Sequence, residues 1–229
     1  MSIAGKLEQI AFNMQSVYDN GYYYGVAIGE TNGIARGEKK ERDRFWDTYQ
    51  QNGTRTDYEY AFSGDGWTDE LFKPKYPFLN VRSPYMMFMC ARRLTYIPAI
   101  EFSPYASYGT MFRGCKSLVT IEKLKFTWTL KIVEDYNLRI GSDSFRDCLE
   151  LQNLTIEGTL LRGGLDLQWS TKLSRDSIIS IITALDGDVS NQTITLSLTS
   201  VDNAFDGGST GYDWLNLIAT KSNWTISLA

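Results

Sequence analysis

Three cysteines, Cys90, Cys115 and Cys148, are the first residues to consider for chemistry. A zinc or redox site would need a close Cys-x-x-Cys pair or histidine ligands, and the sequence contains no histidine. The cysteines are also too few and too scattered for a disulfide framework. We therefore predict that they pack as small buried side chains and that the protein uses no metal or other cofactor.

A second candidate for chemistry is a possible calcium loop. Asp186, Asp188 and Ser190 begin like such a loop. Asn191 stands where the loop needs glycine, and Ser197 stands where it needs a bidentate glutamate. We interpret the segment as a turn between a helix and a strand.

A third candidate is the stretch GDGWTDE, in which Asp65, Asp69 and Glu70 lie beside Trp67. Two of these carboxylates would suit the acid/base pair of a glycoside hydrolase. Such residues are also common in loops without catalysis, and the absence of histidine removes the commonest general base. We predict that the protein is not an enzyme, and a carbohydrate-active enzyme remains a third hypothesis.

Composition excludes some classes of partner. Acidic and basic residues are interspersed and the net charge is −4, so no basic surface is available for nucleic acid. No apolar run approaches the length of a membrane span, so we expect no membrane insertion. The first residues lack the pattern of a secretory signal, and we expect synthesis in a cytoplasm without ordinary export.

Aromatic residues are more numerous than one small core requires. The chain has 6 tryptophans and 14 tyrosines. Exposed aromatic side chains suit sugar rings or a protein partner. We predict that Trp67, in a loop, and Trp128, in an insertion, are exposed contact residues.

The elements that would position these residues fall into two regions. Residues 1–80 predict a helical, aromatic attachment region, with one helix over 3–18 and another over 37–53 that ends at Gly53. From residue 81 to 229, short β-prone runs alternate with helical stretches at 174–185 and 211–223. Ser174 is the expected N-cap of the first of these helices.

The second region contains an internal repeat with apolar residues at every third position. Its three copies begin at Phe88, Phe112 and Phe145, offset by 112 − 88 = 24 and 145 − 112 = 33 residues. We predict that the repeat positions point to one side and form one buried stack. These positions are Phe88, Ala91, Leu94, Ile97, Phe112, Cys115, Leu118, Ile121, Phe145, Cys148, Leu151 and Leu154.

Weaker copies follow toward the C-terminus. Ile179, Ile182 and Leu185 precede one β-prone run, and Leu215 and Ile218 precede the last one. In both copies we expect a helix to replace the tighter turn. Atypical last units are expected in a repeat protein, because they must cover the open end of its core.

The pattern Phe-x-x-Cys-x-x-Leu-x-x-Ile resembles the BspA-type leucine-rich repeat of bacterial surface antigens, closely over 85–160 and loosely over 161–229. The resemblance implies a mixed α/β fold, in which an irregular leucine-rich-repeat solenoid follows the helical, aromatic-rich region. The arrangement of repeats behind the block RFWDTYQQNGTRTDYEYAFSGDGWTDELFKPKY, with the ending ATKSNWTISL, is also similar to that of proteins encoded in phage and prophage tail regions.

The second resemblance implies a non-enzymatic bacteriophage virion protein of the tail or baseplate tip, with a role in assembly and host-surface binding. Its implied partners are other virion proteins, further copies of itself, and a glycan or protein of the host surface. The alternative hypothesis is an adhesion or protein-interaction module of the same repeat class on a bacterial cell surface.

Overall fold

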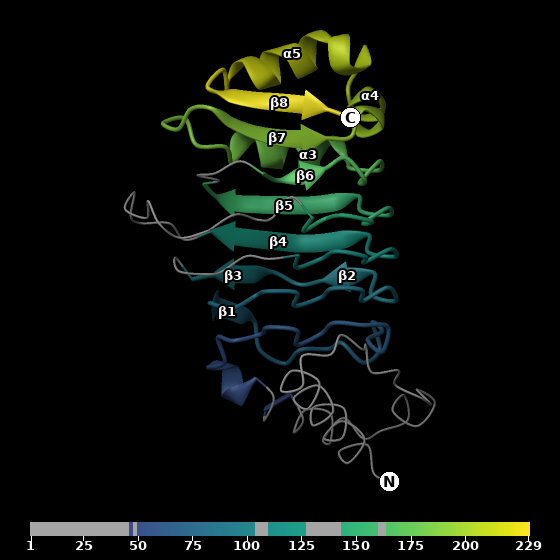
Figure 1. The fold of residues 1–229 in the computed structure, drawn as a ribbon, viewed down its shortest axis with the longest axis vertical. Helices are drawn as coiled ribbons and strands as arrows, with labels where there is room; N and C mark the ends of the chain where they lie inside the picture. The colour runs from purple at the N-terminus through teal and green to yellow at the C-terminus, as the bar shows by residue number, and fades with distance from the viewer. Residues whose placement is uncertain (1–45, 48–49, 104–109, 127–142, 160–163) are drawn as a thin grey trace.

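The structure is a computed structural model that describes residues 46–47, 50–103, 110–126, 143–159 and 164–229 (Figure 1). It shows a mixed α/β chain whose strands form two parallel sheets. The predicted helix over 3–18, Trp128 and most of the predicted helix over 37–53 lie outside the described residues. At the end of the second helix, Gly53 closes a short 3₁₀-helix, η2 (Gln51–Gly53), with φ of +87°.

The first sheet has five strands, and successive turns of the chain add them one above another. β4 pairs with β5 on one side and with both β2 and β3 on the other, and β3 also pairs with β1. The strands are β1 (Phe78–Val81), β2 (Tyr96–Ile97), β3 (Ile100–Phe102), β4 (Thr120–Phe126) and β5 (Asn153–Gly158).

The second sheet runs in the order β6-β7-β8 and is joined by three α-helices. Its arrows point opposite to those of β4 and β5 in Figure 1. The strands are β6 (Asp166–Leu167), β7 (Gln192–Leu196) and β8 (Trp224–Leu228); the helices are α3 (Arg175–Thr183), α4 (Leu198–Ala204), η3 (Gly208–Thr210) and α5 (Tyr212–Ala219). Helix α3 begins at Ser174, whose side chain accepts from the amide of Ser177, so the predicted N-cap is confirmed.

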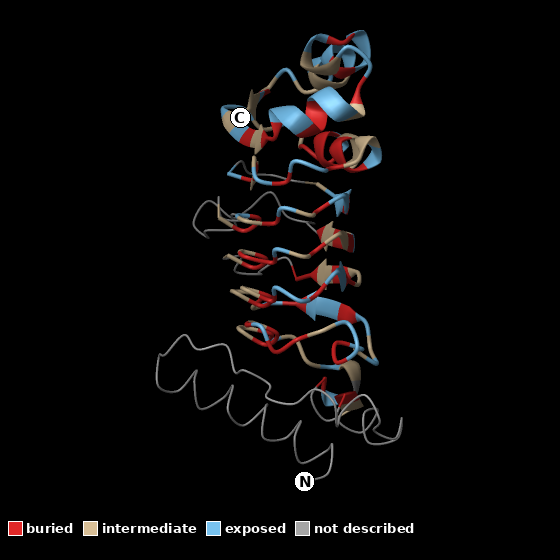
Figure 2. Cartoon of the chain, turned by 90° about the vertical axis from the view of Figure 1, so that its right-hand side faces the viewer, coloured by how far each residue is buried: buried red, intermediate tan, exposed pale blue. Residues whose placement is uncertain are grey.

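One hydrophobic core runs through the stack, as the buried positions in Figure 2 show. All twelve positions of the repeat pattern lie in it, each no more than 1% exposed. The ring of Phe88 stacks on that of Phe112 with 5.8 Å between centroids, and Phe112 lies 5.2 Å from Phe145. A three-residue step therefore places the same residue type at the equivalent position of each turn.

The structure adds two turns that the repeat search missed. Phe62 lies 5.3 Å from Phe88 in a stacked arrangement, and its amide donates to the carbonyl of Met87 just as that of Phe88 donates to Met111. The ring stack therefore begins one turn earlier than predicted. On the other side, the hydroxyl of Ser170 donates to the carbonyl of Cys148 at 3.3 Å.

The prediction that Trp67 is an exposed contact residue is wrong, because its side chain is only 2% exposed. Its ring lies 5.3 Å from Phe62, edge to face, and 6.2 Å from Trp46. The glycine-rich stretch around Trp67 belongs to the additional turn and covers the first end of the ring stack. Residues 46–80, where described, share one core with the rest of the chain.

The three-residue spacing extends only in part into the last helices. Leu215 is 48% exposed and Ile179 is half-buried, whereas Ile178, Ile181 and Trp214 are buried. An α-helix has 3.6 residues per turn, so it selects a different set of inward positions from a tighter turn. The predicted helices are confirmed. Of the weaker repeat positions, Ile182 and Leu185 are buried, Ile179 and Ile218 are half-buried, and Leu215 is exposed.

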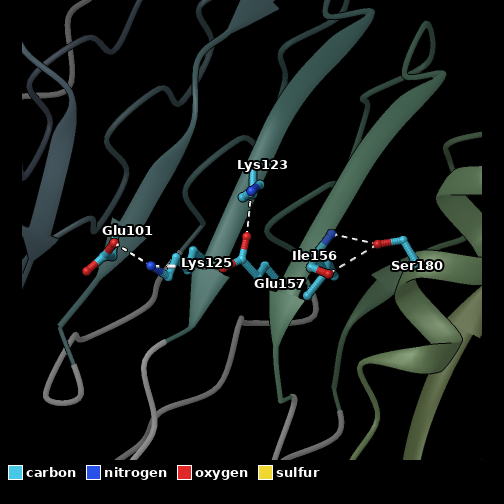
Figure 3. Close-up of polar contacts among 6 residues, drawn as sticks. All are labelled: Glu101, Lys123, Lys125, Ile156, Glu157 and Ser180. Carbon is cyan, nitrogen blue, oxygen red and sulfur yellow. Dashed lines mark hydrogen bonds and ion pairs between the residues drawn. The ribbon is translucent and has the colours of Figure 1, made fainter.

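Helix α3 lies beside β5 and occupies the position where the next strand would pair. The hydroxyl of Ser180 accepts from the amide of Ile156 at 2.8 Å and donates to its carbonyl at 3.2 Å (Figure 3). Ser177 does the same with the amide of Leu154 and the carbonyl of Gln152. Two serine hydroxyls thus satisfy backbone groups that an edge strand leaves unpaired.

Candidate binding surface

The outer face of β2, β3, β4 and β5, called the sheet face below, carries paired polar side chains that consecutive strands bring together. Apolar residues of these strands point to the core, and the alternate residues point outward, as the period of two requires. Parallel register then aligns outward residues from neighbouring turns side by side. The outward side chains are Tyr96, Glu101, Thr120, Glu122, Lys123, Lys125, Asn153, Thr155 and Glu157.

A bulge in β4 brings two consecutive residues to this face. Ile121 pairs with Leu154 and Leu124 pairs with Ile156, so β4 uses one residue more than β5 over the same span. Glu122 is exposed and Lys123 is half-buried within this extra length. Glu122 accepts a hydrogen bond from Tyr96 in the preceding turn, and Lys123 donates one to Glu157 in the following turn.

A chain of ion pairs crosses three strands (Figure 3). Lys125 Nζ lies 2.9 Å from Glu101 Oε2 on one side and 3.9 Å from Glu157 Oε1 on the other. Lys123 also donates to Glu157. These contacts lower the pKa of Glu157, mainly through its hydrogen bond with Lys123, and raise the pKa of Lys125, mainly through Glu101. The charges are partly exposed to solvent, so these ion pairs contribute little to stability.

Tyr96 provides an aromatic group at the margin of the same face. Its side chain is 44% exposed, and its hydroxyl donates to Glu122. The hydrogen bond to this carboxylate and, second, partial burial raise the pKa of Tyr96 to about 12. Tyr96 was not predicted as a contact residue, although its place one residue before the inward Ile97 indicates an outward side chain.

Two of the cysteines, Cys115 and Cys148, are buried and hydrogen-bonded to the backbone. The thiol of Cys115 donates to the carbonyl of Phe88 at 3.0 Å, and that of Cys148 donates to the carbonyl of Phe112 at 3.1 Å. Burial raises the pKa of Cys115 far above its ordinary value and that of Cys148 to about 12. Both are neutral hydrogen-bond donors between adjacent turns, a role the sequence prediction of simple apolar packing did not include.

Two of the three carboxylates considered for glycoside hydrolysis, Asp65 and Asp69, have structural partners. Asp65 lies 3.1 Å from Arg92, and Asp69 accepts from both the amide and the hydroxyl of Thr95 in the next turn. Glu70 is exposed. In the described turns, Asp65 and Asp69 therefore link one repeat to the next.

The segment considered as a calcium loop is the turn between α3 and β7, as predicted. The amide of Asp188 donates to the carboxylate of Asp186 at 2.6 Å, and Asn191 has φ of +59°. This is a local Asx-type turn, with Asn in the left-handed region that it tolerates.

Another exposed aromatic residue lies in the turn that follows β6. Trp169 is 39% exposed, and the guanidinium of Arg146 lies 5.9 Å from its ring centroid. Trp169 was not predicted as an exposed residue, because the turn to which it belongs lacks the Phe and Cys of the repeat.

No protein-family model, curated protein or solved structure matches the chain. Among the described residues, no helix is both long and apolar enough to span a membrane. The class that the geometry itself defines is a mixed α/β stack of parallel strands with a polar, ion-paired face.

Proposed function

We propose that this chain is an irregular leucine-rich-repeat solenoid that acts as a binding scaffold without enzymatic activity, in the tail or baseplate tip of a bacteriophage. Its role would be to contribute to particle assembly and to bind the host surface through the sheet face. The observation that carries the proposal is the register of β3, β4 and β5, which aligns outward side chains of successive repeats into one continuous surface.

The chemistry of this surface favours a polar partner. Glu101, Lys125 and Glu157 alternate in charge across three strands, and Tyr96 lies at the margin. Such a mixed pattern selects partners by charge complementarity and by hydrogen bonding. A host-surface protein or glycan presents both kinds of group, and aromatic side chains bind the apolar faces of sugars.

Antibody labelling of particles from a lysed culture, viewed by electron microscopy, tests the location. We expect label at the tail end of particles. Label on intact bacterial cells alone would contradict the virion proposal and support the alternative, an adhesion module of a bacterial cell surface.

The sheet face can be tested separately with purified protein and host cells. The double variant Glu101→Gln, Lys125→Gln removes the central ion pair without a change of net charge. We expect weaker adsorption to cells than for the wild type, while the exposed-residue variant Leu215→Ala adsorbs normally. Equal adsorption by all three proteins would place the binding site elsewhere.

A further inference from the structure

The outer edge of β8, called the β8 edge below, differs from the other sheet ends described above. β8 is the last strand of the second sheet and pairs with β7 in an uninterrupted parallel register from Gln192↔Trp224 to Leu196↔Leu228. Its sequence, WTISL, contains no charged residue and no proline. Edge strands usually carry such residues, or a bulge, as protection against further pairing.

Backbone alternation shows which groups this edge presents. The amide of Ala229 donates to the carbonyl of Leu196 at 3.1 Å, so Ala229 faces β7. Backbone groups of successive residues in a strand point to opposite sides, so Ile226 and Leu228 present N–H and C=O groups outward. Within the described part of the chain, no strand pairs with them.

The apolar layer beneath this edge is incompletely covered. Ile226 and Leu228 are half-buried and pack against the core, as do Leu217 and Ile218 of α5. In Figure 1, α5 lies above β8 at the C-terminal end of the stack. A strand added at the β8 edge would therefore gain backbone hydrogen bonds and bury these side chains further.

Two ends of the first sheet, at β5 and β1, have protection that β8 lacks. At β5, serine hydroxyls of α3 occupy the backbone groups. At β1, the register shifts between Phe78 and Val81, and the chain continues past the strand through the bridge Asp57↔Ser83. The openness of β8 is thus a local property and does not hold for every sheet end.

Charge indicates what kind of segment would pair there. Residues 186–229 contain five aspartates and one lysine, which is −5 + 1 = −4, the net charge of the whole chain. The lysine, Lys221, donates to the carbonyls of Thr183 and Leu185. The aspartates are Asp186, Asp188, Asp202, Asp206 and Asp213, of which Asp213 is ion-paired with Arg175 at 2.7 Å.

Acidic segments lie at both ends of β8. The indole of Trp224 donates to the carbonyl of Asp186 at 2.7 Å, which places the acidic turn before β7 at the start of β8. At the other end, the amide of Leu198, the first residue of α4, donates to the carbonyl of Ala229 at 2.9 Å. Helix α4 carries Asp202. Two copies brought together at this edge would repel, whereas a basic segment would be attracted.

We propose that the β8 edge binds an extended basic segment of a partner protein, which pairs with Ile226 and Leu228 as an additional strand. Its apolar side chains would cover the half-buried core residues, and its basic side chains would face the aspartates. The surface is distinct from the sheet face, so the proposal does not depend on the function proposed above.

The probe is a fluorescein-labelled peptide of alternating lysine and valine, and binding to the full chain is measured by fluorescence anisotropy. We expect saturable binding that weakens at least about tenfold when NaCl rises from about 50 mM to about 500 mM. A peptide of alternating glutamate and valine should not bind. A lysine–valine peptide N-methylated at alternate residues, on its pairing edge, should bind about tenfold or more weakly, because it lacks the strand donors.

Variants of the chain locate the site. Ile226→Pro removes the outward N–H, and Ile226→Ala removes the same side chain but keeps this donor. We expect Ile226→Pro to bind much more weakly than Ile226→Ala, and the pair Asp202→Asn, Asp206→Asn to reduce both the affinity and its salt dependence. The sheet-face variant Glu101→Gln, Lys125→Gln should bind the peptide as the wild type does.

Three results would overturn the proposal, and the peptide arms retain their meaning if Ile226→Pro fails to fold. Equal binding of the N-methylated peptide would exclude strand pairing. Equal binding of the glutamate peptide would exclude charge selection. A dimer of the wild-type chain, seen by sedimentation, kept in Ile226→Ala and lost in Ile226→Pro, would show that a second copy occupies the edge.

Discussion

The N-terminal and C-terminal parts of the stack solve the same packing problem with different elements. Up to β5, tight turns carry stacked phenylalanines and the opposite side is a parallel sheet. Beyond β5, α3 and α5 alternate with strands whose direction is reversed, and no described phenylalanine continues the ring stack through β6 (Figure 1). The repeat therefore tolerates exchange of helix and strand, provided that each turn still satisfies the backbone of the previous one.

The hydrogen bonds between adjacent turns are similar in the two parts of the stack. In the N-terminal part, the thiol of Cys148 donates to the carbonyl of Phe112. In the C-terminal part, the hydroxyl of Ser170 donates to the carbonyl of Cys148 and that of Ser200 to Ser170. A small donor at the turn is common to both parts, whereas the large aromatic ring is specific to the first.

The largest expected effect comes from the ring stack. Phe112→Ala removes a fully buried ring between two others and should lower the free energy of unfolding by about 3–5 kcal/mol. Leu167→Ala, at a buried position of the second part, should cost less, about 2–4 kcal/mol. Chemical denaturation measures both, and equal losses would remove the contrast between the two parts.

The next effect concerns the junction at β5. Ser177→Ala leaves the amide of Leu154 and the carbonyl of Gln152 without their hydroxyl partner and should cost about 2–4 kcal/mol. The exposed Ser222→Ala serves as the control and should change stability by less than about 0.5 kcal/mol. Hydrogen exchange at Leu154 should accelerate in Ser177→Ala, and an unchanged rate would show that α3 does not protect the edge.

Reciprocal exchange of the two small donors should have a smaller effect. Cys148→Ser places a hydroxyl in an apolar, fully buried position and should cost about 1–2 kcal/mol. Ser170→Cys should cost less than about 1 kcal/mol, because the thiol still donates to the carbonyl of Cys148. If thermal denaturation shows the reverse order, the two positions differ by more than their donor.

The smallest effect is a pH dependence at the sheet face. The folded-state pKa of Tyr96 is about 12, above the ordinary value of 10.0, so its contribution to stability is complete below pH 10 and is lost as pH rises through 12. The pKa values of Tyr58 and Tyr76 are also raised, so ultraviolet titration should show several tyrosines that ionise late, among them Tyr96. In Glu122→Gln this tyrosine should ionise earlier, and an unchanged titration would contradict the assigned cause.

Sequence periodicity predicted the buried stack because the same kinds of apolar residue recur at every third position in each of the three copies. It missed the turn at Phe62 because Asp65 stands where later turns have Cys or Ala, and the same error placed Trp67 outside the core. It missed the turn at Ser170 because Leu167 replaces phenylalanine. In both cases the turn is recognised by its hydrogen bonds to the neighbouring turn, which the pattern of side chains in the sequence does not show.

The candidate surface was harder to predict than the core. The β4 bulge shifts Glu122 and Lys123 onto one face, and a period-two reading would place them on opposite faces. Pairing of Lys125 with Glu101 and Glu157 depends on register between turns of unequal length. Such register follows from three-dimensional packing, which a single sequence does not specify.

The buried thiols have a consequence for the kinetics of the molecule. Cys115 and Cys148 are fully buried, whereas Cys90 is half-buried. A thiol reagent can reach the first two only when their turns open, so their labelling rates measure how often each turn separates from its neighbour. Two adjacent turns thus each carry one buried thiol whose labelling rate reports the local opening of that turn.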